Sequence, residues 1–366
     1  MDKKGVFSYL IGDSYEIGKK QGQELSIIDG IEDILFKKDI QKNDEIDESI
    51  QLLKKYYPSL LDELKGVADY FKRKVSDMKF LDSAYLIAGG CSLAAISSKK
   101  TIDGKPYVLR TYDLGIEISD FRMCSTNVEG LLSHSGFSVN FFGRSEGMNN
   151  DGLCITFASC GLPIGNEIGM LKPKISGFNF MVIIRLLLET CCSTEEALDL
   201  LKTVPIASNM NLLITDSFEN TAIVETIDGN IYIKNSKNSA TVLTNHPVIE
   251  EAKEAQNSYL NNSLIRYEIL NDKLKNQKTV KLEEIKSLLK TNYPKGVSML
   301  DYDDYFGTVQ TILFDIKDKT VNFSFGSLAY NEEFKLKVGE NLKMLPQDLC
   351  LPNKVYGNDF WGMKEF

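Results

Sequence analysis

The chain has 366 residues, 43% of them hydrophobic, and a formal net charge of −9. It can therefore bury a large core, as one big domain or two modest ones, and its acidic balance argues against a nucleic-acid partner. No apolar run is long enough for a membrane span or a signal peptide, which predicts a cytoplasmic protein without a membrane partner.

The first part of the chain is predicted to be helical, over residues 12 to about 78. Its first helix opens at 15–22 with Asp13 or Ser14 as the cap, and later apolar residues follow at three- and four-residue spacing. The composition changes at Gly89-Gly90, the only convincing seam in the chain. Short alternating segments after this seam predict strands at 91–97, 106–112, 137–142 and 152–158.

After residue 158 the sequence predicts two helices, a group of strands, two more helices and a last group of strands. An apolar helix is predicted over 180–190, and Ser193 to Glu196 form a capping box for a helix that ends near Leu201. The remaining expected elements are strands at 211–215, 222–226, 231–234 and 241–244, helices near 258–274 and 281–290, and strands at 308–316 and 320–326. This order of groups predicts an α+β fold of two packed antiparallel sheets with helices outside.

Cys91 is the first candidate for chemistry, because it follows Gly90 directly and begins a predicted strand. If the Gly90–Cys91 bond were cut, Cys91 would carry a thiol and a free α-amine, with pKa values near ~8.5 and ~8. The amine could then take the thiol proton without a histidine, which suits a chain with only His134 and His246. The glycines also allow backbone conformations that an N–S acyl shift would require. The alternative is a small buried hydrophobe.

Arg110 and Asp113 lie near the end of the next predicted strand, which a hairpin connects to the strand of Cys91. Alone they would be an exposed ion pair of little energetic consequence. Beside Cys91, we expect Arg110 to favour the thiolate and bind a substrate oxygen. We expect Asp113 to hold the new α-amine.

Two further candidates lie later in the chain. Asn245 stands before His246-Pro247 at a strand end, where it either makes a turn or donates an amide N–H to an oxyanion, an interaction worth roughly 3–4 kcal/mol. Arg266 is one of six arginines in a lysine-rich chain. It is either a helix-surface charge or a group that supports the site or recognises a carboxylate.

The seven cysteines are irregularly spaced and contain no CxxC pair, so neither a zinc ribbon nor a disulfide framework is predicted. Most are expected to be reduced, buried thiols. A zinc site built from Cys154, Cys160, Cys191 and Cys192 has the wrong spacing. We therefore expect no metal and no cofactor.

Taken together, the motifs resemble a known family. The chain resembles the N-terminal-nucleophile (Ntn) hydrolases of the choloylglycine hydrolase and penicillin acyltransferase group, above all the acyl-CoA:6-aminopenicillanic acid acyltransferase branch, peptidase family C45. The residues that carry the resemblance are Gly18-Lys19-Lys20-Gln21-Gly22, Gly90-Cys91-Ser92, Asp103-Gly104, Arg110-Thr111-Tyr112-Asp113, Glu146-Gly147-Met148-Asn149-Asn150-Asp151-Gly152-Leu153, Glu195-Glu196-Ala197-Leu198, Asn211-Leu212-Leu213-Ile214-Thr215-Asp216-Ser217, Thr244-Asn245-His246-Pro247 and Gly307-Thr308-Val309-Gln310-Thr311.

The resemblance implies a four-layer αββα sandwich and self-cleavage between Gly90 and Cys91. It implies a mainly helical segment 1–90, packed on a catalytic core 91–366. It also implies catalytic roles for Cys91, Arg110, Asp113, Asn245 and Arg266.

At two positions the chain differs from the family pattern, and both differences argue against bile salts and penicillins as its substrates. The bile-salt branch has a second amide-bearing asparagine at the place where this chain has Ser159. The penicillin acyltransferase has an arginine before its last strand pair, and residues 298–301 contain none. Ser159, His246 and Tyr112 are candidates for contact with the substrate.

The resulting hypothesis is a self-processed cysteine amidohydrolase or acyltransferase. It would act on a small linear amide or its acyl donor, such as an N-acyl amino acid or an acyl-CoA, and a homo-oligomer is compatible with the sequence. Two alternatives stay open. One is a Cys–His peptidase that uses His246 or His134, and the other is an unprocessed, non-catalytic protein of the same fold that binds a small molecule.

Overall fold

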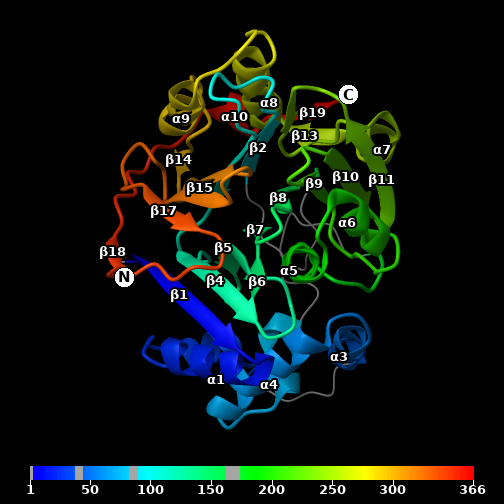
Figure 1. Cartoon of the computed structure of the whole chain (residues 1–366), viewed down its shortest axis with the longest axis vertical. Coiled ribbons are helices and arrows are strands. Elements are labelled where there is room, and N and C mark those ends of the chain that lie inside the picture. Colours follow the sequence, from blue (N-terminus) through cyan, green and yellow to red (C-terminus); the bar gives the residue numbers. More distant parts are fainter. Residues whose placement is uncertain (1–2, 38–43, 82–89, 162–173) are drawn as a thin grey trace.

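The computed structural model describes residues 3–37, 44–81, 90–161 and 174–366 (Figure 1). Gly89, the first residue of the predicted seam, lies outside these residues. The helices of the N-terminal segment lie at one end of the molecule, and α8 and α9 lie at the opposite end (Figure 1). Between them lie two large β-sheets.

The N-terminal segment is mainly helical, as predicted, but it begins with a strand that was not predicted. Asp13 caps the first helix, because its carboxylate accepts the backbone N–H of Glu16 at 3.0 Å. Two short 3₁₀ turns, Val75–Asp77 and Lys79–Leu81, end the described part of the segment. Its other elements are β1 (Lys4–Gly12), α1 (Ser14–Leu25), α2 (Ile31–Leu35), α3 (Asp44–Tyr56) and α4 (Pro58–Tyr70).

The first sheet has ten strands, and the N-terminal segment is built into it. Strand β1 pairs with β4 in parallel from Val6↔Arg122 to Gly12↔Val128, whereas the other pairings in this sheet are antiparallel. Its order is β11 (Asn230–Ser236), β10 (Thr221–Ile227), β9 (Met210–Thr215), β8 (Cys154–Ser159), β7 (Glu146–Asn149), β5 (His134–Val139), β4 (Arg122–Val128), β1 and β18 (Gln347–Asp348), with β6 (Gly143–Arg144) beside β5.

The second sheet has seven strands, all paired in antiparallel fashion. Its order is β12 (Ala240–Leu243), β2 (Gly90–Ile96), β3 (Tyr107–Leu114), β15 (Phe306–Asp315), β16 (Thr320–Phe325) and β17 (Phe334–Lys337), with β14 (Leu300–Asp301) beside β15. A separate ribbon joins β13 (Ser258–Leu260) to β19 (Met363–Glu365). The other helices are α5 (Phe180–Thr190), α6 (Thr194–Leu201), α7 (Glu250–Ala255), α8 (Asn261–Leu274), α9 (Leu282–Lys290) and α10 (Asn358–Trp361).

Three hydrophobic clusters define four layers. One cluster joins α4, α5 and α6 to the outer face of β8, β9 and β10. A second lies between the two sheets and contains Cys91, Tyr112, Phe137 and Phe314. A third joins α8 and α9 to the outer face of β2, β3 and β12. The predicted α+β fold, an αββα sandwich of two sheets flanked by helices, is confirmed.

Most expected elements are present, but several strands were missed. The helix expected near 258 begins at Asn261, after strand β13. Strand β4 was missed because its sequence, RMCSTNV, lacks alternation, although Ser125 and Thr126 are buried in it. Ser125 is satisfied by the hydroxyl of Ser135 at 2.8 Å, so burial does not leave it unpaired. Among the described helices, none is both long and apolar enough to cross a membrane.

Candidate active site

Cys91 is the second residue of β2 and lies in the layer between the two sheets, with 1% of its surface exposed. It is directly opposite Tyr112 on β3, and Leu93 is opposite Arg110. Opposed residues of an antiparallel pair project to the same face, and alternate residues share a face. Cys91, Arg110 and Tyr112 therefore all point toward the space between the sheets.

Arg110 contacts the thiol and is held by the opposite sheet. Its Nη2 donates to Cys91 Sγ at 3.5 Å, and its Nε donates to the carbonyl of Phe157 at 2.9 Å. Its Nη1 forms a fully buried ion pair with Glu146. The guanidinium also lies over the ring of Tyr112, at 4.3 Å from the centroid. These contacts fix the orientation of the guanidinium beside the sulfur.

Glu146 completes this charged cluster. Its carboxylate accepts the hydroxyl of Ser145 at 2.8 Å, the side-chain amide of Gln310 at 2.9 Å and the backbone N–H of Phe137 at 3.2 Å. Both oxygens are thus satisfied inside the protein, as a buried carboxylate requires. Glu146 and Gln310 lie in motifs that carry the family resemblance, but no role was predicted for either residue.

Asp113 lies on the other face of β3, directly opposite Gly90 on β2. Its Oδ1 accepts the hydroxyl of Thr308 at 2.6 Å. Its Oδ2 is buried and has no hydrogen-bond partner in the described part of the chain. Burial raises the pKa of this carboxyl to about 7, against the opposing influence of Arg266, Thr308 and Arg110.

Gly90 is required for space, because its neighbours leave no room for a side chain. A Cβ atom on it would lie 2.2 Å from the ring of Phe306 and 3.0 Å from Asp113 Oδ2. Gly90 is not among the residues with a positive φ, and it has an ordinary strand conformation. The sequence-based explanation, that the two glycines allow the distortion an N–S acyl shift requires, stays a prediction, because Gly89 lies outside the described residues.

Asn245 and Arg266 hold the backbone of Cys91 from the α8 side. The Oδ1 of Asn245 accepts the backbone N–H of Cys91 at 2.9 Å and Nη2 of Arg266 at 2.8 Å. Arg266 Nη1 donates to the carbonyl of Cys91, and its Nη2 also donates to Asn262 Oδ1 at 2.8 Å. Arg266 is fully buried, so the alternative of a helix-surface charge is wrong.

The side-chain amide of Asn245 is also bonded on its donor side. Its Nδ2 donates to the carbonyl of Ser159 at 3.1 Å and to the hydroxyl of Ser159 at 2.9 Å. Ser159 therefore lies next to the predicted oxyanion donor. In this structure the two residues are bonded to each other.

The surroundings of Cys91 raise the pKa of its thiol. Burial is the largest cause and Asp113 adds to it, whereas Arg110 and Arg266 oppose it. The two guanidinium groups do not outweigh burial, so the uncut chain holds a protonated thiol at neutral pH. Formation of the thiolate requires an additional base.

Burial lowers the pKa of both histidines, so both are neutral at pH 7. His246 is within hydrogen-bonding distance of the Ser263 hydroxyl, 2.8 Å from Nδ1, and burial lowers its pKa to about 4. Its ring packs against Tyr259 and Tyr267. Burial also lowers the pKa of His134 well below its usual value. In the described ranges, no contact joins either imidazole to Cys91.

The loop that carries Asn245 is positioned by residues that sequence reasoning missed. Asn211 on β9 donates its side-chain amide to the carbonyls of Thr244 at 2.9 Å and His246 at 3.0 Å, on both sides of Asn245. Ser263 on α8 accepts the backbone N–H of Asn245 at 2.8 Å. These bonds come from distant parts of the chain, so spacing along the sequence does not reveal them.

Glu225 on β10 holds the next turn of the same loop. Its carboxylate accepts the backbone N–H groups of Val248 at 2.7 Å and Ile249 at 3.1 Å. Burial raises the pKa of Glu225 to about 7. The loop is therefore tied to β9, β10 and α8 at once.

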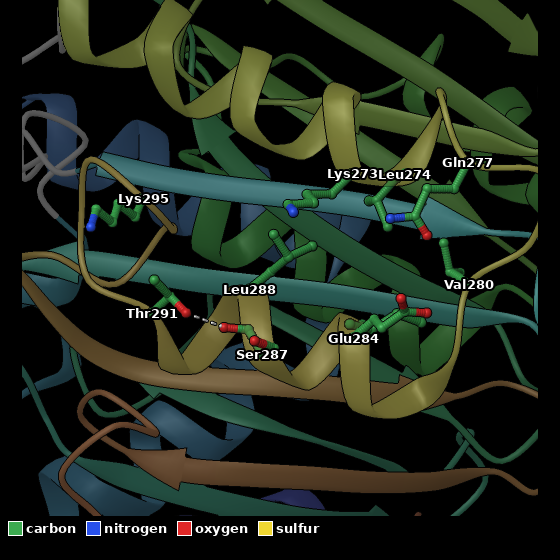
Figure 2. A pocket seen from close by; sticks show the side chains of 10 residues that line it. Lys273, Leu274, Gln277, Val280, Glu284, Ser287, Leu288, Thr291 and Lys295 are labelled. Carbon is green, nitrogen blue, oxygen red and sulfur yellow. Dashed lines mark hydrogen bonds between the residues drawn. The ribbon is translucent and has the colours of Figure 1, made fainter.

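All seven cysteines are free thiols. Across the described ranges, no group of three or more His, Cys, Asp or Glu side chains could hold a metal ion. Figure 2 shows a cavity of about 210 Å³ lined by residues of α8 and α9, including Lys273, Leu274, Glu284 and Leu288. None of the predicted site residues lines this cavity, so it is separate from the site around Cys91.

Comparison with known proteins gives the family. The family model of acyl-coenzyme A:6-aminopenicillanic acid acyl-transferase matches residues 100–330, more than half of the chain. The chain belongs to this family. The matched region begins after Cys91 and contains Arg110, Asp113, Asn245 and Arg266. The family recognised from the sequence motifs is thus confirmed, and no match to a curated protein was found.

Three solved structures are similar to the chain. Penicillin V acylase from Agrobacterium tumefaciens is 18% identical with a TM-score of 0.46, over 68% of this chain and 86% of that one. A mutant of conjugated bile acid hydrolase from Clostridium perfringens is 12% identical with a TM-score of 0.46, over 73% and 99%. The Caenorhabditis elegans ortholog of N-acylethanolamine-hydrolyzing acid amidase is 14% identical with a TM-score of 0.43, over 62% and 93%. At these values the likeness identifies no substrate for this chain.

Proposed function

We propose that the chain is a cysteine amidohydrolase or acyltransferase that cuts itself between Gly90 and Cys91. It would act on a small linear amide, such as an N-acyl amino acid, or on an acyl-CoA donor. Cys91 would be the nucleophile, and Arg110, Asp113, Asn245 and Arg266 would surround it. Membership of the acyltransferase family supports this class of reaction.

The observation that carries the proposal is Asp113 Oδ2, which lies beside Gly90 and has no hydrogen-bond partner among the residues that the structure describes. A buried carboxylate oxygen without a hydrogen bond is costly, and it lies next to the bond that would be cut. Cleavage would place a new ammonium group at Cys91. That ammonium could donate to Asp113 Oδ2 and keep its existing bond to Asn245 Oδ1.

Self-cleavage would proceed by attack of the Cys91 thiol on the carbonyl carbon of Gly90. A C–S bond forms and the Gly90–Cys91 C–N bond breaks, with the thiol proton passing to the nitrogen. Water then hydrolyses the thioester, so that Gly90 ends in a carboxylate and Cys91 regains its thiol. Arg266, which donates to the carbonyl of Cys91, would keep the new N-terminal residue in place.

Turnover would use the new α-amine as the base. The α-ammonium first loses a proton to water, and the neutral amine then takes the thiol proton, the sulfur attacks the acyl carbonyl, and the amine returns the proton to the leaving nitrogen. Water or an acceptor amine then resolves the thioester. Backbone N–H groups and Asn245 would stabilise the oxyanion. For this, the side-chain N–H of Asn245 must release Ser159 and donate to the oxyanion of the substrate instead.

The two segments, 1–90 and 91–366, would stay together after cleavage. Strand β1 is paired with β4 from Val6 to Gly12, and Arg122 of β4 donates to the side chains of Ser8 and Gln21 at 2.8 and 3.0 Å. We therefore expect a two-chain protein in which the first segment remains part of the core. The helical segment would not act as a leaving propeptide.

Intact mass measurement of the purified protein tests the proposal. The wild-type protein is expected to show two masses, those of segments 1–90 and 91–366. The Cys91→Ala protein is expected to show the mass of one uncut chain and to have no activity. An uncut wild type with the same activity as Cys91→Ala would refute the proposal. An uncut wild type that binds small molecules without turnover would support the non-catalytic alternative.

A further inference from the structure

An apolar cavity of about 540 Å³ lies at the end of the sandwich where the two sheets and the N-terminal segment meet. Its walls come from β1, the α1–α2 connection, β3, the β5–β6 turn and the start of α5. Its volume is in the range of small-molecule sites. Aliphatic side chains make up much of its lining: Ile27, Ile28, Ile34, Leu114, Val139 and Met181.

The N-terminal segment contributes exposed isoleucines to this cavity. Ile27 is 84% exposed, Ile34 is 49% exposed and Ile28 is 41% exposed. Exposed apolar residues that are scattered singly over a surface need no explanation, whereas a cluster of them marks a binding site. The three isoleucines are exposed together at one cavity, which indicates an apolar occupant.

One residue that lines the cavity is the cross-strand neighbour of Cys91. Tyr112 lines the cavity and is the direct cross-strand neighbour of Cys91, and such neighbours have Cα atoms about 4.5–5.5 Å apart. The guanidinium of Arg110 covers the same Tyr112 ring. Phe180 also lines the cavity, and its ring is stacked on the ring of Phe157 with the centroids 3.8 Å apart. The backbone carbonyl of Phe157 accepts a hydrogen bond from Arg110 Nε.

The cavity wall also contains strained backbone. Asn140 and Phe141 have φ values of 51° and 65°, which non-glycine residues rarely adopt. Asp120 holds this turn, since its carboxylate accepts the backbone N–H of Phe141 at 2.7 Å and the hydroxyl of Ser138 at 2.8 Å. Strain that is kept in this way is typical of ligand-contacting segments.

We propose that this cavity binds the aliphatic acyl chain of the substrate, which enters past Tyr112 when Cys91 attacks the acyl carbonyl. This inference rests on the proposed function and deepens it by assigning the acyl group. Four charged residues also line the cavity, Lys3, Lys4, Glu117 and Asp120; the Asp120 carboxylate is already hydrogen-bonded to Ser138 and Phe141. A long unbranched acyl chain fits the aliphatic walls, whereas an acetyl group would leave them unfilled.

The test is a series of N-acylglycines from acetyl to dodecanoyl. Wild-type kcat/KM is expected to rise with chain length by up to about fourfold for each methylene group, the equivalent of about 0.8 kcal/mol. The double variant Ile28→Ser/Ile34→Ser is expected to lower the ratio of decanoyl to acetyl kcat/KM at least tenfold. Ile102→Ser, at a 60% exposed isoleucine that does not line the cavity, is expected to leave that ratio unchanged.

Failure of this inference and failure of the proposed function can be told apart. Cleavage of acetylglycine without any dependence on chain length would overturn the acyl cavity and leave the proposed function intact. A preference for phenylacetyl over decanoyl would also overturn the aliphatic assignment. If no amide is cleaved, calorimetric titration with N-decanoylglycine decides: binding that the double variant weakens supports the cavity, and equal or absent binding overturns it.

Discussion

The Oδ2 atom of Asp113 lies 3.0 Å from the position that a Cβ atom on Gly90 would occupy, and it has no hydrogen-bond partner among the described residues. The uncut chain thus keeps a buried acceptor beside the bond proposed for cleavage. Such an acceptor is unfavourable for folding alone. It becomes favourable once an ammonium group is present at Cys91.

Gly90→Ala is predicted to impair self-cleavage and to destabilise the uncut protein by about 1–3 kcal/mol, because the added methyl group collides with Phe306. Intact mass of Gly90→Ala with Cys91 retained measures cleavage, and chemical denaturation of Gly90→Ala in the Cys91→Ala background measures stability. Gly357→Ala is the matched control, since no atom lies within 4 Å of a Cβ at that position. Normal cleavage and stability in Gly90→Ala would contradict the steric argument.

The pKa of Asp113 predicts a pH-dependent stability for the uncut chain. Its folded value of about 7 lies above the ordinary value of 3.8, so the folded state holds the proton more tightly than the unfolded state. The free energy of unfolding should therefore fall as pH rises from about 4 to about 7, by at most about 1.4 kcal/mol per pH unit.

The Cys91→Ala protein, with and without Asp113→Asn, tests this dependence by urea denaturation at several pH values. The asparagine variant should show a flatter profile over the same window. Glu225 also has a raised pKa of about 7 and contributes equally to both proteins, so the difference isolates Asp113. Identical slopes in the two proteins would show that Asp113 is ionised normally.

Glu146→Gln is predicted to destabilise the protein by about 3–5 kcal/mol, because it leaves the buried guanidinium of Arg110 without a counter-charge. Chemical denaturation measures the loss. The double variant Arg110→Met/Glu146→Met should be less destabilised than the sum of its single variants. Asp62→Asn, which breaks the exposed ion pair with Lys65, should cost no more than about 1 kcal/mol.

Asn211→Leu is predicted to lower kcat by about 100-fold with a smaller change in KM, because the loop that carries Asn245 loses two bonds. Steady-state kinetics give the two constants separately. Asn235→Leu, at an exposed position on β11, is the control for the substitution type. A change in stability without a change in kcat would limit Asn211 to a structural role.

The His246→Asn protein is predicted to cleave itself into the same two fragments as wild type. With a pKa lowered to about 4, this imidazole is neutral at pH 7, and its described hydrogen bonds go to Thr244 and Ser263 rather than to Cys91. Intact mass shows whether both fragments still form. Complete loss of cleavage with a normally folded chain would favour the Cys–His alternative.

The sequence determined much of the order of the elements and identified Cys91, Arg110 and Asp113 as candidates, because these depend on local patterns. Alternation and turn residues predicted β2 and β3, and the Ser193 hydroxyl caps α6 by accepting the N–H of Glu196 at 3.2 Å. Even here the pattern was incomplete, since the Glu196 carboxylate accepts from Cys192 rather than from Ser193. Strand β1 was missed because its parallel partner, β4, is more than 100 residues away.

The tertiary structure alone decided which charges are paired and which are not. Arg110 meets Glu146 across the two sheets, and Arg266 reaches Cys91 from α8; such contacts depend on layer packing rather than on sequence spacing. The same packing leaves Asp113 Oδ2 without a hydrogen-bond partner within the described ranges and makes Gly90 necessary for space. A sequence names the groups that can react, but only burial and the neighbours brought by folding set their protonation and their contacts.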